Sequence, residues 1–261
     1  MTKSPPEISH AAAEHESIGL PSADIDCDRP RGASTKERLL AAAGPIFAQR
    51  GFDDVTVREL SSQAKVNVAA VGYHFGDKLG LYRAVIDHIR SRKDQRFPTP
   101  DNTEPDPRKR LTQNVSHLLC RMASSGEMGW ETQLLLREIQ RPTPVFEHIV
   151  GVVFRPQFDH LIETLRELSQ SELQAHQLEQ IALSIVGQCT YYATGTSMIS
   201  MLIAPKHLET KFSRNSIVVH IVATTLASIQ SGTIQDYEQL ITDFLVPVSE
   251  SCQSAPLQYN C

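Results

Sequence analysis

The chain has 261 residues, of which 41% are hydrophobic and 21% are charged. This balance is ordinary for a soluble globular protein and supplies enough apolar material for a core, which excludes a wholly disordered chain. The five cysteines are odd in number, widely spaced and form no CxxC pair, which argues against a disulfide framework and a structural zinc site. The first 20 residues contain prolines and glutamates where a secretory signal needs an apolar segment, so we expect a reduced, cytoplasmic setting.

The net charge of −5 is unevenly distributed along the chain. Residues 1–33 carry −3, residues 34–96 carry +4 and the remaining residues carry −6. For a nucleic-acid binder, a local positive charge matters more than the sign of the total. The acidic total therefore does not exclude nucleic acid as a partner of residues 34–96.

Residues 1–33 contain few large apolar side chains, and we predict that they form a disordered N-terminal arm. Ser34 and Thr35 are good helix caps, and apolar residues then recur at helical spacing up to a natural helix end at Gly51. Pro45 lies inside this predicted helix and should kink it, because proline has no backbone N–H to donate.

Thr56 and Glu59 have the spacing of a capping box, which predicts the start of a second, short helix. Asn67 can cap a third helix that ends near His74 or Phe75, and a fourth begins at Lys78. Short helices joined by tight turns in this order indicate a helix-turn-helix.

The four prolines of residues 97–107 prevent a continuous helix, and we place a domain boundary in this proline-rich connection. Helical periodicity then continues through residues 108–248, which we predict to form a second, helical domain. Expected helices run from about Trp130 to Gln140, from Val145 to Leu168 with a bend at Pro156, and over 235–247. Residues 249–261 are expected to form a flexible tail.

Two stretches, 180–205 and 215–235, contain no Asp, Glu, Lys or Arg. A helix without a charged face has little reason to meet water. Polar residues interrupt both stretches and argue against membrane spans, so we favour two helices per subunit that pack as a four-helix bundle in a homodimer. The expected interface residues are Ile181, Ile185, Gln188, Tyr192, Ile217, Ile221, Thr224, Thr225 and Ser228.

The third predicted helix has features that suit DNA. Its small residues Ala69, Ala70 and Gly72 let the backbone approach a major groove, whereas Tyr73 and His74 supply donors for phosphate oxygens. The alternative from the residues alone is a small helical domain with a chance excess of basic residues. No Arg or Gln lies in this helix, so base readout would depend on apolar contacts with thymine methyl groups, together with Lys65 or Asn67.

Residues 34–90 resemble the DNA-binding domain of the TetR family of bacterial transcription regulators. The resemblance depends on Phe47, Gly51-Phe52, Thr56-Val57, Ala64, Val66, Leu81-Tyr82 and above all the run Tyr73-His74-Phe75-Gly76-Asp77-Lys78. It implies phosphate contacts by Thr56, Tyr73, His74 and Lys78, and base contacts by Val68, Ala69, Ala70 and Gly72, with Asn67 able to make either. The full expected DNA-binding set is Thr56, Val57, Lys65, Asn67, Val68, Ala69, Ala70, Gly72, Tyr73, His74 and Lys78.

The run from Leu136 to Thr143 and the later Pro156 resemble the C-terminal domain of the CecR-type subgroup. This resemblance implies dimerisation through the last helices and an effector pocket in the C-terminal domain. Arg137 and Glu138 suit a polar ligand head, but an interhelical salt bridge or a helix cap is the favoured alternative. The candidate pocket residues are Trp130, Gln133, Arg137, Glu138, Cys189, Tyr192 and Met198.

We find no sequence motif of a hydrolase, a P-loop enzyme, a zinc protease or a dinucleotide-binding enzyme, and no close histidine spacing for a metal. The sequence thus predicts an all-α homodimeric regulator without cofactor, most simply a repressor that leaves double-stranded operator DNA when it binds a small-molecule effector. The alternative is a helical small-molecule-binding or scaffolding protein that no longer reads a specific operator.

Overall fold

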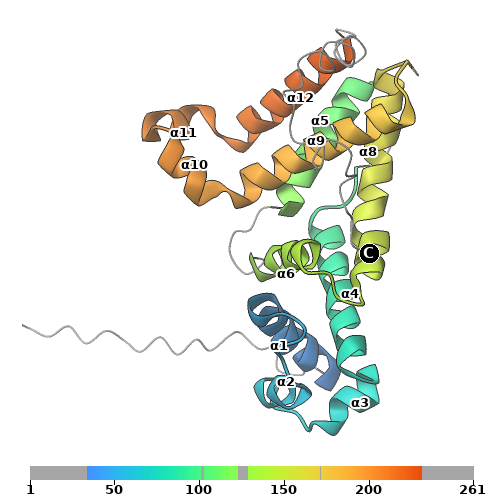
Figure 1. Cartoon of the computed structure of the whole chain (residues 1–261), viewed down its shortest axis with the longest axis vertical. Coiled ribbons are helices and arrows are strands. Elements are labelled where there is room, and N and C mark those ends of the chain that lie inside the picture. Colours follow the sequence, from blue (N-terminus) through green and yellow to red (C-terminus); the bar gives the residue numbers. More distant parts are fainter. Residues whose placement is uncertain (1–33, 101–102, 123–128, 171, 231–261) are drawn as a thin grey trace, which may run out of the picture. The chain divides into compact units, whose positions relative to one another are not determined.

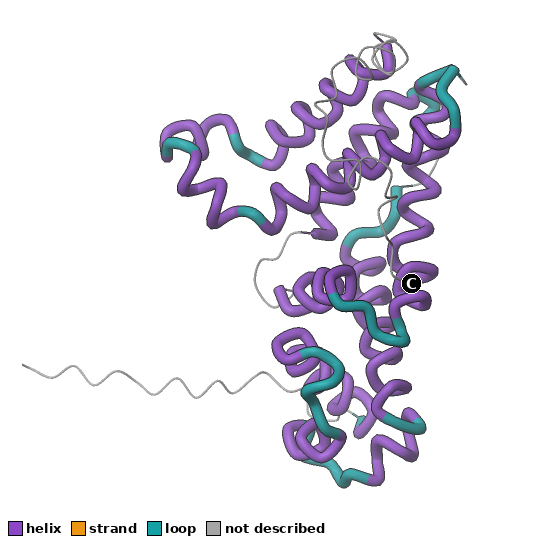
Figure 2. Tube along the Cα trace, viewed as in Figure 1, coloured by secondary structure: helices purple, strands orange, loops and turns teal. Residues whose placement is uncertain are grey.

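The computed structural model describes residues 34–100, 103–122, 129–170 and 172–230, and these ranges contain helices and no strand (Figures 1 and 2). This confirms the predicted all-α fold. The predicted arm 1–33, the predicted helix 235–247 and the predicted tail 249–261 lie outside the described residues. None of the described helices has the length and hydropathy that crossing a membrane requires.

The first four helices have the predicted local signals. They are α1 (Thr35–Arg50), α2 (Val57–Gln63), α3 (Ala69–Phe75) and α4 (Lys78–Arg96). The Ser34 hydroxyl accepts from the Glu37 amide at 3.2 Å, and the Glu37 carboxylate accepts from the Ser34 amide at 2.7 Å. These reciprocal bonds satisfy N–H groups that the first turn leaves without helical partners. Gly51 ends α1 at a φ of +90°, a conformation that favours glycine.

The next helices are α5 (Pro107–Met122), α6 (Gly129–Gln140), α7 (Phe146–Ile149) and α8 (Arg155–Leu168), with a π-helical turn η2 (Val150–Phe154) between α7 and α8. The single bent helix predicted from Val145 to Leu168 is thus divided by a π turn directly before Pro156. Pro156 has no N–H to donate to the preceding turn, and a change in hydrogen-bond register there fits that loss.

The last described helices are α9 (Ala175–Thr194), α10 (Thr196–Leu202), α11 (Pro205–Lys211) and α12 (Arg214–Gln230). The uncharged stretch 180–205 therefore forms parts of two helices, because Gly195 ends α9. A Cβ at Gly195 would lie 2.8 Å from the carbonyl oxygen of Tyr191, too close for any other residue without a local shift.

Two clusters of buried side chains form the described core. The first joins helices α1–α4 with Leu134 and Leu135 of α6, Val145, and Ile149 and Val153 of α7 and η2. The second joins α5, α8, α9 and α12. Helix α6 follows the proline-rich connection in sequence but packs against α1, so the first core includes residues from both sides of that connection.

Buried Lys93, near the end of α4, links three helices. Its ammonium donates to the carbonyl oxygen of Arg121 at 2.6 Å and to the Thr132 hydroxyl at 3.2 Å. Burial lowers the pKa of Lys93 to about 8 because the protein interior solvates the charged form less well than water. This residue thus ties α4 to the end of α5 and the start of α6.

The two helices with uncharged stretches are not buried all round in the single chain. Ile181, Ile185 and Ile221 are buried in the second core and Thr225 is buried as well, so these four are not available for an interface between subunits as predicted. The prediction failed there because these stretches are apolar on both sides, and the sequence does not show which side faces the chain's own core. Of the other predicted interface residues, Thr224 is exposed and Gln188, Tyr192, Ile217 and Ser228 are half-buried.

The opposite side of α9 and α12, called here the outer face, is apolar and open to solvent. Leu183 is 58% exposed and Val219 is 66% exposed. Leu183, Gly187 and Tyr191 follow one another at four-residue spacing along α9, and therefore share one side of the helix. The outer face consists of Leu183, Gly187 and Tyr191 of α9 with Val219, Ala223 and Ala227 of α12.

Candidate nucleic-acid interface

Helix α3 presents an exposed surface made of small apolar residues followed by two polar rings. Tyr73 is 86% exposed, and its ring lies 4.9 Å from the His74 ring in an edge-to-face arrangement. Val68, Ala69 and Gly72 are exposed as well, whereas Val71 points into the first core. Val71 is thus the buried anchor of this short helix, Ala70 and Phe75 pack partly against the same core, and the other side chains are exposed to solvent.

A surface depression of about 500 Å³ lies along this side of α3. Its described lining includes arginine, lysine and histidine and no carboxylate, which favours an anionic partner. It is lined by Thr35, Arg38, Lys65, Val66, Asn67, Ala69, Ala70, Tyr73 and His74.

The turn that leads into α3 is fixed by short-range hydrogen bonds. Lys65 has a φ of +54°, and the Asn67 side-chain oxygen accepts from the Ala69 amide at 2.9 Å. The Asn67 oxygen is thus used for capping, which leaves its amide N–H groups as donors. Arg38 of α1 donates to the carbonyl oxygens of Ala64 and Lys65 and supports the turn from outside.

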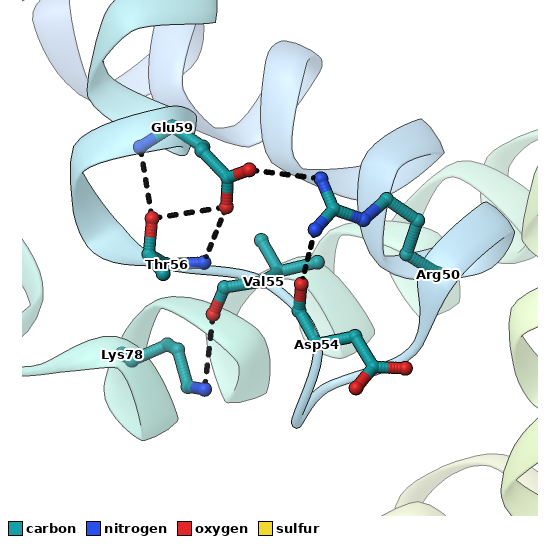
Figure 3. Close-up of polar contacts among 6 residues, drawn as sticks. All are labelled: Arg50, Asp54, Val55, Thr56, Glu59 and Lys78. Atoms are coloured by element: carbon teal, nitrogen blue, oxygen red, sulfur yellow. Dashed lines mark hydrogen bonds and ion pairs between the residues drawn. The ribbon is translucent and has the colours of Figure 1, made fainter.

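Thr56 is held by the capping box that the sequence predicts (Figure 3). Its amide and hydroxyl both donate to the Glu59 carboxylate at 2.9 Å, and Arg50 binds the other carboxylate oxygen at 3.0 Å. These bonds lower the pKa of Glu59 to about 2, chiefly through the Thr56 amide. The amide and hydroxyl of Thr56 are therefore already bonded to a carboxylate in the first turn of α2. A phosphate contact by Thr56 stays a prediction.

Lys78, at the start of α4, donates to two backbone carbonyls in the loop before α2. Its ammonium lies 2.9 Å from the oxygen of Phe52 and 3.1 Å from that of Val55, the latter bond shown in Figure 3. It also lies 4.3 Å from the centre of the Phe52 ring, a favourable cation–π distance. The structure thus gives Lys78 a positioning role, with one of its three N–H groups left for a phosphate.

The structure brings Lys65, Asn67, Ala69, Ala70, Tyr73 and His74 together at the depression, while Val68 and Gly72 are exposed on the same short helix. Thr56, Val57 and Lys78 lie at the starts of α2 and α4. Sequence reasoning missed Thr35, Arg38 and Val66, which also line the depression. No sequence signal marks Arg38, because it reaches Ala64 and Lys65 from 26 and 27 residues away.

The seven candidate effector residues do not form one pocket. Trp130 lies against α1, where a Cβ at Gly44 would come within 2.4 Å of its ring. Cys189 is buried in the second core, and burial raises the pKa of its thiol to about 12. Tyr192 packs against the second core, whereas Met198 is exposed. Residue type alone selected these positions, and the fold separates them.

Arg137 and Glu138 connect α6 to the helices of the first core. The Arg137 guanidinium donates to the carbonyl oxygens of Arg50 at 2.8 Å and of Gln49 at 3.4 Å. Buried Glu138 accepts from the Tyr82 hydroxyl at 2.5 Å and from the amide and hydroxyl of Thr143. Both therefore make structural contacts, but these are hydrogen bonds and not the interhelical salt bridge that was expected. Arg137 and Gln133 also line a separate surface depression.

Two family models match the chain. Residues 39–85 match the model described as bacterial regulatory proteins, tetR family, and residues 107–229 match the C-terminal domain of the HTH-type transcriptional dual regulator CecR. CecR of Shigella flexneri is 28% identical over 141 residues, which cover 50% of this chain and 63% of CecR. The regulator YttP of Bacillus subtilis is 40% identical over 56 residues, 22% of this chain and 27% of YttP. The chain thus spans less than two thirds of the curated relatives it matches.

Solved structures agree with the fold. The regulator AibR, solved in complex with isovaleryl coenzyme A and operator DNA, matches 73% of this chain and 97% of its own chain, with a TM-score of 0.54 and 15% identity. At this identity the likeness concerns the fold alone.

Proposed function

Because the chain belongs to the TetR family of bacterial regulatory proteins, we propose that it binds a near-palindromic DNA operator as a homodimer and represses transcription there until a small-molecule effector releases it. Members of a family of transcription regulators need no catalytic residues, which agrees with the absence of enzyme motifs in the sequence. Double-stranded DNA, a second copy of the chain and the effector are the proposed partners.

The exposed side of α3 is the observation that carries this proposal. It combines a depression whose described lining residues are basic or neutral with small side chains that allow close approach to base pairs. Phosphate contacts would position the domain, while the methyl groups of Val68, Ala69 and Ala70 would meet thymine methyls in the major groove. Two such helices in a dimer would enter successive major grooves about 34–36 Å apart.

The outer face of α9 and α12 supports dimerisation. It is uncharged and exposes large apolar side chains, a combination that single-chain proteins rarely leave open to water. A two-fold axis would bring the same face of two copies together as four helices. The proposed interface thus moves from the buried isoleucines predicted earlier to Leu183, Tyr191 and Val219.

The proposal is tested by selecting bound sequences from random duplex DNA with the purified full chain at a stated salt concentration. We expect a palindrome with half-sites about one helical turn apart. If a folded dimer enriches no sequence, either alone or with cell-extract metabolites added, operator binding is refuted and the scaffolding alternative is favoured.

Replacing Gly72 with alanine is expected to stabilise the protein and weaken DNA binding. No atom lies within 4 Å of where the alanine Cβ would be, so packing does not require glycine there. Alanine should raise the free energy of unfolding by about 0.5–1 kcal/mol, because it restricts the unfolded chain and favours helix. Operator affinity should fall about tenfold, because the methyl group occupies space that the DNA needs.

Thermal unfolding and titration with the selected operator measure the two effects of Gly72→Ala. Gly151→Ala is the matched control, because this glycine also has open space at its Cβ but lies in the π-helical turn η2, away from both α3 and the outer face. Unchanged operator affinity in Gly72→Ala would contradict close approach of DNA at this position.

A further inference from the structure

A second surface depression, of about 540 Å³, lies beside α6. Its volume falls within the range of small-molecule sites. Gln133, Arg137 and Gln140 of α6 line it together with Thr194 and Thr196 at the junction of α9 and α10, and Ala48 of α1 closes it. The depression therefore lies where the helices of the first core meet the end of α9.

The charge of this lining is one-sided. Among the described residues that line it, Arg137 is the single charged one and none is a carboxylate. Two glutamines add neutral amide groups whose N–H groups can donate to an oxygen. A planar guanidinium beside such donors suits a carboxylate or a phosphate, because both accept two parallel hydrogen bonds from arginine.

Arg137 has donors to spare in this position. It uses two of its five N–H groups on the carbonyl oxygens of Gln49 and Arg50, at the end of α1. The guanidinium also lies directly over Gly51, where a Cβ would come within 2.6 Å of it. Arg137 therefore caps α1 with one edge and lines the depression as well.

We propose that this depression binds a small oxyanion-bearing metabolite, a carboxylate or a phosphate, through Arg137 with Gln133 and Gln140 beside it. The anion would compete with the α1 carbonyls for the guanidinium and so weaken the attachment of α6 to α1. This regulatory part rests on the proposed function, because it assumes that the anion is the effector and that it changes DNA binding through the contact of α6 with α1. The anion can change operator affinity only by as much as its own affinity differs between the conformation that binds the operator and the conformation that does not.

The single tryptophan of the chain gives a direct readout, because Trp130 lies on α6 and packs against Gly44 of α1. The full chain without DNA is titrated with inorganic phosphate and, separately, with benzoate at constant ionic strength. We expect a saturable change in Trp130 fluorescence with at least one of the two anions, and the two titrations distinguish a phosphate ligand from a carboxylate ligand. Arg137→Gln should weaken the binding at least tenfold.

Arg141→Gln is the matched control, since Arg141 is an exposed arginine one helical turn later that does not line the depression. It should bind the anion as the wild type does. Because Arg137→Gln also removes hydrogen bonds to α1, Gln133→Glu is a second variant. This variant leaves those bonds in place and adds a repulsive charge at an exposed position. It should therefore weaken anion binding tenfold without lowering the unfolding temperature.

The proposal is overturned if neither anion gives a saturable signal, or if Arg137→Gln or Gln133→Glu binds as tightly as Arg141→Gln. These titrations contain no DNA. A failure of the selected operator to bind would therefore refute the proposed function separately, without changing the outcome at this site.

Discussion

The double substitution Leu183→Glu with Val219→Glu is expected to give a folded monomer that binds the operator at least 100-fold more weakly than the wild type. Both side chains are exposed on the outer face, so the charges do not disturb the chain's own core. In a dimer they would be desolvated without partners, which costs several kcal/mol. A monomer then loses the effective concentration that links two half-site contacts, commonly worth about 10²–10⁴ in affinity.

Sedimentation equilibrium and operator titration measure the two consequences of this double substitution. Ile139→Glu is the control for adding a charge at an exposed apolar position, because Ile139 is 53% exposed on α6, away from the outer face. It should stay dimeric. A stable dimer from the double variant would place the interface elsewhere on the chain. Ile185→Glu, by contrast, should unfold the chain, because Ile185 is fully buried in the second core.

Glu138→Leu is expected to destabilise the chain by about 3 kcal/mol or more. The carboxylate is buried and accepts from three donors: the Tyr82 hydroxyl, the Thr143 amide and the Thr143 hydroxyl. A buried donor left without a partner, such as the Tyr82 hydroxyl, costs roughly 1–3 kcal/mol, and the loss of the acceptor for the two half-buried Thr143 donors adds to that cost. Tyr82→Phe leaves the carboxylate with two donors and should cost less, about 1–3 kcal/mol.

Urea unfolding of both single variants and the double variant tests whether the two residues act together. The losses should not add, because the double variant removes donor and acceptor at once, and the shortfall should be about 1 kcal/mol or more. Tyr73→Phe is the matched control, since this tyrosine is almost fully exposed and its hydroxyl should contribute little to stability. Additive losses would mean that the Tyr82–Glu138 hydrogen bond does not couple α4 to α6.

The features that sequence predicted well are those decided within a few residues. The capping boxes at Ser34 and Thr56 each need a glutamate three residues later, so the sequence alone shows that the two partners will meet in the first helical turn. The exposed side of α3 follows for the same reason, because Val71 alone of its central residues is buried.

Features that depend on distant residues escaped prediction. Arg137 bonds to Arg50 across 87 positions, and Tyr82 bonds to Glu138 across 56. The uncharged pattern of α9 and α12 indicated that both sides are apolar, yet it contained no information on which side meets α5 and α8. Choosing effector residues by type could not group them in space, because Trp130 and Cys189 pack in different cores.

The packing of α6, α7 and η2 into the first core has a consequence for building hybrid regulators. A chimera joined in the proline-rich connection 97–107 would keep α1–α4 but remove Leu134, Leu135, Val145, Ile149 and Val153, which cover them. Each apolar side chain lost from such a site typically costs about 2–5 kcal/mol when nothing replaces its volume. A junction after Phe154 would keep the first core but would separate α5 from its partners α8, α9 and α12 in the second core. The two cores therefore interleave along the chain, and neither junction allows a simple exchange of sensor domains.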